Sequence, residues 1–146
     1  DEKFNSGWAK IQGPSNGKSL PAIPEYSEYI YSEPEFSWEI PIGVTAIEFP
    51  NSNDFVKYQD YLFVTDTNNG IIYKFKLDES RTKFEFNSPH LQDNVLNMLK
   101  DSSGNEPMDE IVFAKNLGLI SDMKFGPDGA LYVISLMEGK IYKIST

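Results

Sequence analysis

Four polar residues stand together in the turn "DTNNG", and their oxygen atoms are of the kind that bind Ca²⁺. Asp66, Thr67, Asn68 and Asn69 supply carboxylate, hydroxyl and amide oxygens at consecutive positions. A calcium loop needs further oxygens in a fixed register, with a bidentate Glu. The Asn-Gly pair is also the strongest short signal for a β-hairpin, since both residues tolerate positive φ. The sequence therefore favours a plain hairpin turn.

The sequence gives little support for acid–base or nucleophilic catalysis. The chain contains one His, His90, which follows Ser-Pro and is expected to be a surface residue beside a helix N-terminus. Pairs of acids such as Glu33 with Glu35 fall in predicted loops, where both carboxylates are solvated. With no Cys in the chain, disulfides, thiolate metal sites and a Cys nucleophile are excluded. We assign no catalytic residue.

Two further patterns have a structural and a functional interpretation. The stretch "GPDG" resembles a phosphate loop, but Pro127 fixes φ, Asp128 accepts backbone N–H groups and Gly129 takes positive φ, so a turn is expected. Trp8 and Trp38 could stack on sugar rings. Core packing is the preferred interpretation for both, because Trp beside a strand start usually buries its ring.

The overall composition narrows the class of protein. In 146 residues the aromatic share is 14%, and aromatics occur among Val and Ile in short runs, which favours β-structure. The formal net charge of −9 repels polyanions, so nucleic acid is not expected as a partner. No apolar run is long enough to cross a bilayer, and the first residues lack the regions of a signal peptide.

The chain is predicted to be all-β with one short helix. Strands are expected at Val44–Phe49, Tyr61–Asp66 and Ile71–Leu77, and three more lie within "ISDMKF", "ALYVISL" and "KIYKIST". The weaker segments "KFEF" and "EIVFAK" are also read as strands. Helical spacing of apolar residues predicts a short helix from about Leu91 to Lys100. Residues 13–35 are expected to form a long surface loop that its tyrosines hold to the domain.

Two hairpin segments repeat each other. "LFVTDTNNGIIYKF" (62–75) and "LYVISLMEGKIYKI" (131–144) are identical at six of fourteen positions. The similarity extends upstream, so that each copy runs Gly, strand, turn, strand, tight turn, strand. Repetition of a four-stranded meander is typical of a β-propeller. A compact antiparallel sandwich with two similar hairpins is the alternative.

Four motifs, "NSGWAKIQG", "PIGVTAIEF", "FVKYQDYLFVTDTNNGIIYKFKL" and "ISDMKFGPDGALYVIS", follow one another along the chain. Together they resemble the glucose/sorbosone dehydrogenase family, which is related to pyrroloquinoline quinone (PQQ) glucose dehydrogenase. "NSGWAKIQG" is similar to the family's "NYGWP" signature, and "PIGVTAIEF" to its Pro-Thr/Ser-Gly strand. "FVKYQDYLFVTDTNNGIIYKFKL" resembles the family's strand pair, and "ISDMKFGPDGALYVIS" its Arg-x-Arg-Asp segment with the following Gly-Pro-Asp-Gly. The resemblance covers nearly the whole chain, in order.

This resemblance implies that the chain is the C-terminal half of a six-bladed propeller. The missing N-terminal half, with the catalytic His, would then be a partner supplied elsewhere. The implied cofactors are PQQ and Ca²⁺, the implied substrate is an aldose, and the location is secreted or extracytoplasmic. The family's Lys position falls on Asn68 and its two Arg positions on Leu119 and Ser121, while its Asp is retained as Asp122.

The three substitutions remove the positive charges that would pair with the carboxylates of PQQ. Lys115 and Lys124 are near in sequence, but alternation places Lys124 on the solvent side of its strand. The cofactor-binding candidates are therefore Asn68, Ser121 and Asp122. The competing hypothesis is a propeller without the redox cofactor that binds a glycan or a protein.

The expected architecture is a partial β-propeller of two four-stranded antiparallel blades plus part of a third. Residues 1–42 form a loop-rich entry segment, 43–116 a blade with a helical insertion, and 117–146 the last, three-stranded blade. If such a half folds by itself, its exposed strand edges allow self-association.

Overall fold

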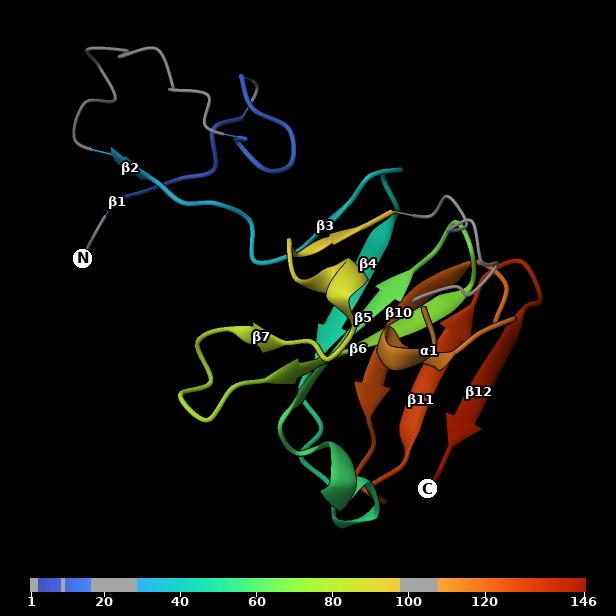
Figure 1. Cartoon of the computed structure of the whole chain (residues 1–146). Coiled ribbons are helices and arrows are strands. Elements are labelled where there is room, and N and C mark those ends of the chain that lie inside the picture. The colour runs from blue at the N-terminus through green and yellow to red at the C-terminus, as the bar shows by residue number, and fades with distance from the viewer. Residues whose placement is uncertain (1–2, 9, 17–28, 98–107) are drawn as a thin grey trace.

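A computed structural model describes residues 3–8, 10–16, 29–97 and 108–146, and these form a mostly β-structure with antiparallel main sheets (Figure 1). The strands are β1 (Lys3–Asn5), β2 (Tyr29–Tyr31), β3 (Ser37–Trp38), β4 (Val44–Glu48), β5 (Tyr61–Asp66), β6 (Ile71–Leu77), β7 (Phe84–Glu85), β8 (Val95–Leu96), β9 (Val112–Ala114), β10 (Ile120–Phe125), β11 (Leu131–Ser135) and β12 (Lys140–Ile144). The helical segments are η2 (Asn53–Tyr58), η3 (Pro89–Leu91) and α1 (Met108–Ile111). The all-β prediction is confirmed.

The first sheet is a meander of β4, β5 and β6, all three at the predicted places. All pairs are antiparallel, and Leu62 lies opposite Phe75 as the hairpin pattern predicts. The outer edge of β6 is shared by two strands: β9 pairs with Ile72 and Tyr73, and β7 pairs with Lys76 and Leu77. The two weak strand signals in the sequence therefore both mark real strands on one edge.

The second sheet is the three-stranded meander β10-β11-β12. Leu131 lies opposite Ile144, and Val133 opposite Tyr142. The predicted turn "GPDG" joins β10 to β11: the Gly126 N–H donates to the Ala130 carbonyl (2.9 Å), and Gly129 has φ +81°. Both copies of the repeat thus fold as the same hairpin.

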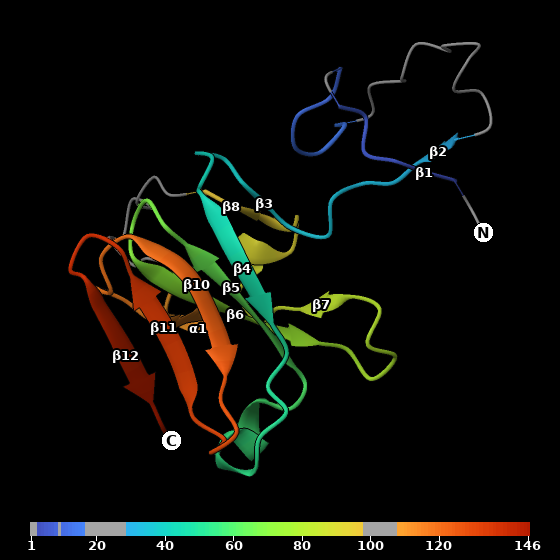
Figure 2. The ribbon, with the colours of Figure 1, turned by 180° about the vertical axis from the view of Figure 1, so that it is seen from behind.

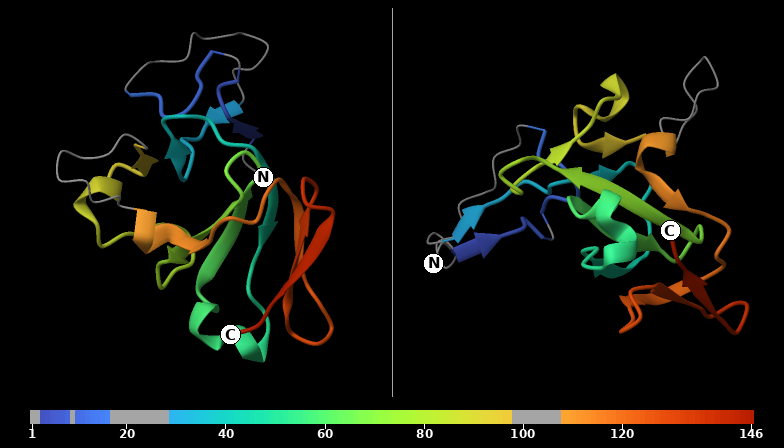
Figure 3. Two further views of the ribbon diagram at one scale, coloured as in Figure 1. Left: turned by 90° about the vertical axis from the view of Figure 1, so that its right-hand side faces the viewer. Right: turned by 90° about the horizontal axis from the view of Figure 1, so that it is seen from below.

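The two sheets pack on each other through faces that are not equivalent in the repeat. The first sheet contributes Phe63 and Ile72 to the shared core, and the second contributes Leu131 and Val133. In the repeat, Leu131 and Val133 correspond to Leu62 and Val64, which belong to the cluster on the opposite face of the first sheet. The copies are therefore stacked head to tail, which means that opposite faces of the repeated sheet meet. In this arrangement β4 lies beside β10 (Figure 3).

The other face of the first sheet is covered by segments outside the meander. Tyr73 and Phe75 of β6 pack against the rings of Phe36 and Trp38, with centroid distances of 4.7–6.0 Å. The short strands β3 and β8 form a parallel pair over this face, with Leu96 fully buried. Strands β5 and β6 are consequently covered on both faces, whereas Val44 and Ile47 of β4 stay exposed.

A 3-10 segment closes the end of the core that lies away from the β5–β6 and β11–β12 turns. Ser52 begins η2 by accepting the Asp54 N–H (3.1 Å), and its own hydroxyl donates to the Gly129 carbonyl (2.6 Å). This places Phe55, which is fully buried, among the rings of Phe63, Phe113 and Phe125. The sequence marks this stretch only as a longer turn.

The helix predicted from Leu91 to Lys100 is wrong over its described part. The chain forms the single turn η3, then places Asn94 at φ +58° and continues as β8. A positive φ ends a right-handed helix, and Asn tolerates that conformation. The apolar side chains that mimicked helical spacing are buried from a turn and a strand; residues 98–100 lie outside the described part.

None of the described helices is long and apolar enough to cross a membrane.

The N-terminal residues form a small separate pairing to one side of the sheets (Figures 1 and 2). β1 pairs with β2 in parallel, so Phe4 lies beside Ile30. Tyr31, one of the three loop tyrosines, donates its hydroxyl to Glu33 (3.0 Å), which also accepts the Ser15 N–H (2.9 Å). Residues 17–28 of the predicted surface loop, Tyr26 among them, lie outside the described part.

Burial of Phe55 makes a stability prediction with a neighbouring control. Phe55→Ala leaves a cavity between the sheets and is expected to lower the free energy of unfolding by about 3–5 kcal/mol. Val56 is 57% exposed, so Val56→Ala is expected to change it by less than about 0.5 kcal/mol. Urea unfolding followed by fluorescence measures both. Similar losses for the two variants would contradict the placement of η2.

Candidate functional site

The candidate residues lie at the end of the two sheets where β4 and β10 begin. Asn68 is in the turn between β5 and β6, and Ser121 and Asp122 follow the start of β10. The Leu117 N–H donates to the Gly70 carbonyl (3.1 Å), which joins the turn to the approach of β10. We call residues 66–70 together with 117–122 the rim; both parts lie in the upper half of Figure 1.

The turn of the rim is shaped by one buried carboxylate. Asp66 is fully buried and accepts the Asn68 N–H (2.9 Å), the Asn69 N–H (3.4 Å) and the Asn69 side-chain amide (2.6 Å). These bonds use the carboxylate to hold the backbone. Only Gly70 has positive φ, at +63°, whereas the Asn-Gly signal predicted it for Asn69 as well. The structure thus supports a hairpin turn here.

The start of β10 contains a β-bulge at Ser121. The pairing with β11 shifts between Ile120 and Asp122, so Ser121 is the extra residue, as bulges require. The Asp122 carboxylate accepts the N–H of Met123 (2.9 Å) and is exposed. Both candidate side chains remain accessible from solvent at least in part, and neither forms a hydrogen bond to Asn68.

A pair of threonines, which the sequence analysis did not single out, connects the two sheets at the rim. The Thr45 hydroxyl donates to the Ile120 carbonyl (2.9 Å) and lies 2.9 Å from the Thr65 hydroxyl. Thr65 is fully buried and also receives the Ala46 N–H (2.8 Å). The sequence offers no signal for this link, because the two residues lie in different strands of a meander.

The charges at the rim do not fit PQQ. Three carboxylates of a buried cofactor need cationic partners, but the family's cation positions hold Asn68, Leu119 and Ser121, and Asp122 adds a negative charge. Lys124 is engaged elsewhere, 3.1 Å from Glu48 of β4, and is mostly exposed as its alternation predicted. Lys115 is exposed and precedes the rim. We derive no chemical step through PQQ.

Ca²⁺ finds no obvious ligand group in the described part either. Within that part, no cluster of three or more His, Cys, Asp or Glu side chains is placed to hold a metal ion. The carboxylate of Asp66, the strongest ligand in "DTNNG", is occupied by three N–H donors.

A buried polar group lies below the turn. Tyr73 is fully buried, and neither its hydroxyl nor the Trp38 Nε1 has a hydrogen-bond partner of normal geometry. Burial raises the pKa of Tyr73 to about 12, and the negative charge of Asp66 contributes to the rise; the nearby Trp38 N–H opposes it slightly. The neutral phenol is therefore strongly preferred in the folded protein.

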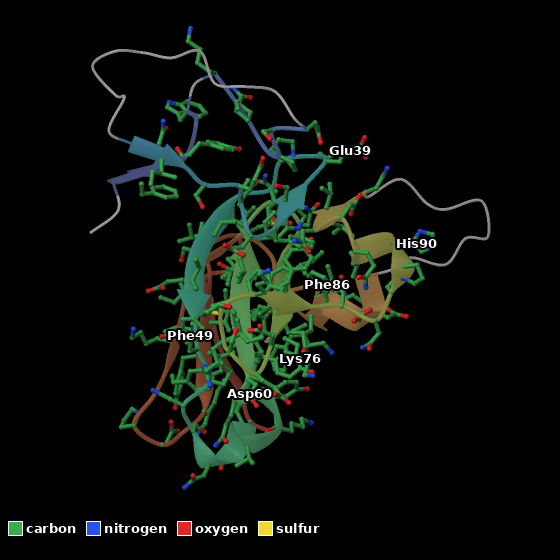
Figure 4. All side chains as sticks on the ribbon, turned by 60° about the vertical axis from the view of Figure 1, so that its left-hand side comes forward. Glu39, Phe49, Asp60, Lys76, Phe86 and His90 are labelled. Atoms are coloured by element: carbon green, nitrogen blue, oxygen red, sulfur yellow. The ribbon has the colours of Figure 1, made fainter. Side chains whose placement is uncertain are left out.

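The remaining candidates, one His and two Trp residues, differ in burial. His90 is exposed on η3 and directed away from the sheets (Figure 4). Trp38 packs in the core as expected, but Trp8 is 78% exposed, which contradicts the core interpretation for that residue. The reason is that Trp8 belongs to the small N-terminal pairing, which has too little apolar surface to bury it.

A shallow pocket that the sequence did not reveal lies beside β6, between β7 and the end of α1. Its volume is about 50 Å³, and its lining includes Tyr61, Lys74, Lys76, Glu85 and Glu110. Lys76 is paired with Glu85 (2.7 Å), and Glu110 accepts the backbone N–H groups of residues 87 and 88. At this volume the pocket has room for a few waters and is small for an organic ligand.

Comparisons with known proteins identify no relative. The chain matches no protein-family model, and searches of the curated proteins and of the solved structures likewise find no match.

The contact between the turn and the approach of β10 can be tested with paired glycine variants. A Cβ at Gly70 would lie 2.6 Å from the Gly118 carbonyl oxygen, whereas a Cβ at Gly139 would have nothing within 4 Å. Both glycines have φ near +60°, so each change to Ala carries a backbone cost of roughly 1–2 kcal/mol. Gly70→Ala should lose a further 1–3 kcal/mol or so through overpacking. Equal losses in urea unfolding would contradict the contact.

The buried phenol predicts a stability loss at high pH. Since the folded pKa of Tyr73 is about 12 and the unfolded value about 10, the unfolded chain loses its proton first. The stability that this group contributes is complete below pH 10 and is lost as the pH rises towards 12. The expected loss is roughly 2 kcal/mol, because one pKa unit corresponds to about 1.4 kcal/mol.

Tyr73→Phe is the control for this pH effect. The variant removes a buried hydroxyl without a partner, so it should be as stable as the parent, or more so, at pH 7. Its unfolding free energy should fall less between pH 10 and 12. If parent and variant show the same pH profile in urea unfolding, the assignment to Tyr73 is wrong.

Proposed function

We propose that the chain forms consecutive blades of a β-propeller related to the glucose/sorbosone dehydrogenases, as their C-terminal half. The observation that carries this proposal is the head-to-tail stacking of the two repeats. Leu131 and Val133 of one copy meet Phe63 and Ile72 of the other, which are not their equivalents in the repeat. Such heterologous stacking of repeated units generates a ring or an open array; a two-fold sandwich would use matching faces.

One face of the second sheet has no described segment packed on it, and this supports continuation of the stack. Ile134 and Ile141 lie side by side on it and are 38% and 68% exposed. In the repeat they correspond to Thr65 and Ile72, which lie on the face of the first sheet that the second sheet covers. A further blade packed on this face would bury both isoleucines. The remaining blades, including the N-terminal half, are the proposed partner.

The proposed activity is binding of a glycan at the rim, without a redox cofactor. Asn68, Ser121 and Asp122 offer amide, hydroxyl and carboxylate groups, which suit the hydroxyl groups of sugars. The absence of cations among the three family positions argues against a tricarboxylate ligand. Like its proposed family, the protein would be secreted or extracytoplasmic.

Aldose oxidation with PQQ and Ca²⁺ is the second candidate. The ordered motifs favour it, above all "ISDMKFGPDGALYVIS" with its retained Asp122. The catalytic His would have to come from the missing half of the propeller. The charge at the rim is the observation against it.

Ligand binding at the rim can be tested with a neutral glycan library and calorimetry on the best ligand. Asn68→Ala and Asp122→Ala should each weaken binding by about threefold to thirtyfold, since each removes one or two hydrogen bonds. Gln59→Ala, an exposed polar change beyond η2 at the other end of the sheets, should leave it unchanged. No glycan binding, or binding insensitive to the rim variants, would refute the proposal.

The same protein, supplied with PQQ and Ca²⁺, separates the two candidates. We expect no quinone absorbance to remain after gel filtration. Retained quinone with aldose-dependent dye reduction would favour the oxidoreductase.

A further inference from the structure

The last strands of the two repeats, β6 and β12, differ in what pairs with their outer edge. In the first sheet, β6 is paired along its outer edge by β9 and β7. In the second sheet, the equivalent strand β12 pairs only with β11 within the described part of the chain. Because the two hairpins share sequence and register, the first sheet shows what the edge of the second can accept.

The turn glycines record the same difference. Gly70 lies against the segment that follows β9: its carbonyl accepts the Leu117 N–H (3.1 Å), and a Cβ on it would meet Gly118. Gly139 has the same backbone conformation, with φ +60° against +63°. Around it, however, the space for a Cβ is open to 4 Å. Among the described residues, the segment that passes the first turn therefore has no counterpart at the second.

Within the described part, nothing pairs with the outer edge of β12, and side chains near the strand are held by bonds to other parts of the chain. Lys140 is paired with Glu138 (3.1 Å) and Lys143 with Asp128 (2.7 Å), so both ammonium groups are bound to the chain's own turns. Lys143 and Tyr132 lower the pKa of Asp128 to about 2, so the carboxylate of this pair is ionised at neutral pH. The hydroxyl of Thr146, just beyond the strand, donates to the Asp54 carbonyl and ties down that end.

We propose that the outer edge of β12 binds an extended, antiparallel strand of a partner polypeptide. The chemistry of the guest strand follows from β9, in which Ala114 lies opposite Ile72 and Val112 opposite Tyr73. The guest therefore carries a small residue opposite Ile141 and a β-branched residue opposite Tyr142. Main-chain hydrogen bonds supply the affinity, as in other cases of strand addition to a sheet edge.

A second copy of the chain fits this edge less well. Antiparallel pairing of β12 with itself about Tyr142 would place the two large rings opposite each other, where the template has Val. Each copy also has a formal net charge of −9, so two copies repel each other. The proposal concerns the edge alone and does not depend on ligand binding at the rim.

A peptide taken from the chain itself provides the probe. A synthetic peptide of residues 109–117, which spans β9, is added to the full chain, and hydrogen exchange is followed by mass spectrometry. At about ten times the peptide's Kd, exchange of the amides in 139–145 should slow about tenfold, while exchange in 71–77 stays unchanged. A peptide with Val112→Pro and Ala114→Pro, which removes ladder donors, should give no protection.

Three outcomes would overturn the proposal. They are no protection of 139–145 at millimolar peptide, protection confined to β6 because the peptide replaces β9, or a dimer in sedimentation with 139–145 already protected. Gly139→Asn supplies a check within the protein, because Asn tolerates positive φ and fills the open space at the turn. It should weaken peptide binding while leaving the urea midpoint nearly unchanged, and undiminished binding would also count against the assigned path of the guest strand.

Discussion

The packing of one β-meander on the back of its own repeat is the constraint on which the rest of the structure depends. The residues that meet between the sheets include Phe63 and Ile72 from the first copy and Leu131 and Val133 from the second, all fully or almost fully buried. The two copies use opposite faces in this contact. The face of the first sheet that packs on the second sheet is therefore equivalent to the face of the second sheet that points away from the first. The contact brings β4 beside β10 and so assembles the rim from segments more than forty residues apart.

The same packing makes the two copies unequal. The first sheet is covered on its second face by the aromatic cluster around Trp38, and its edge is covered by β7 and β9. Within the described part, the second sheet has no strand on its outer edge and no sheet packed on the face that carries Ile141. Ile141 is therefore exposed, although its equivalent, Ile72, which the second sheet covers, is fully buried. The repeat thus serves as an internal reference: each difference between the copies marks a surface that the first copy fills from its own chain.

Electrostatics at the rim point away from the chemistry of the family that the motifs resemble. A buried tricarboxylate needs cations, and the corresponding positions hold neutral side chains beside Asp122. The framework motifs, by contrast, have evident structural roles: Gly129 turns the chain between β10 and β11, and Gly70 allows the close approach of Gly118. The turn motifs shared with the family are therefore explained by the fold, whereas the substituted positions bear on the ligand.

The sequence by itself determined the strands of both meanders. Short runs of alternating apolar residues, bounded by Asn, Asp, Gly and Pro, favour a β-strand with one face buried. It also determined the two hairpin turns and the repeat. It could not determine that Leu91 and Leu96 are buried from a turn and a strand, since that depends on the face of the first sheet that receives them. The bulge at Ser121, the link between Thr45 and Thr65 and the burial of Phe55 likewise followed only from the tertiary structure, because each arises between segments that no local pattern relates.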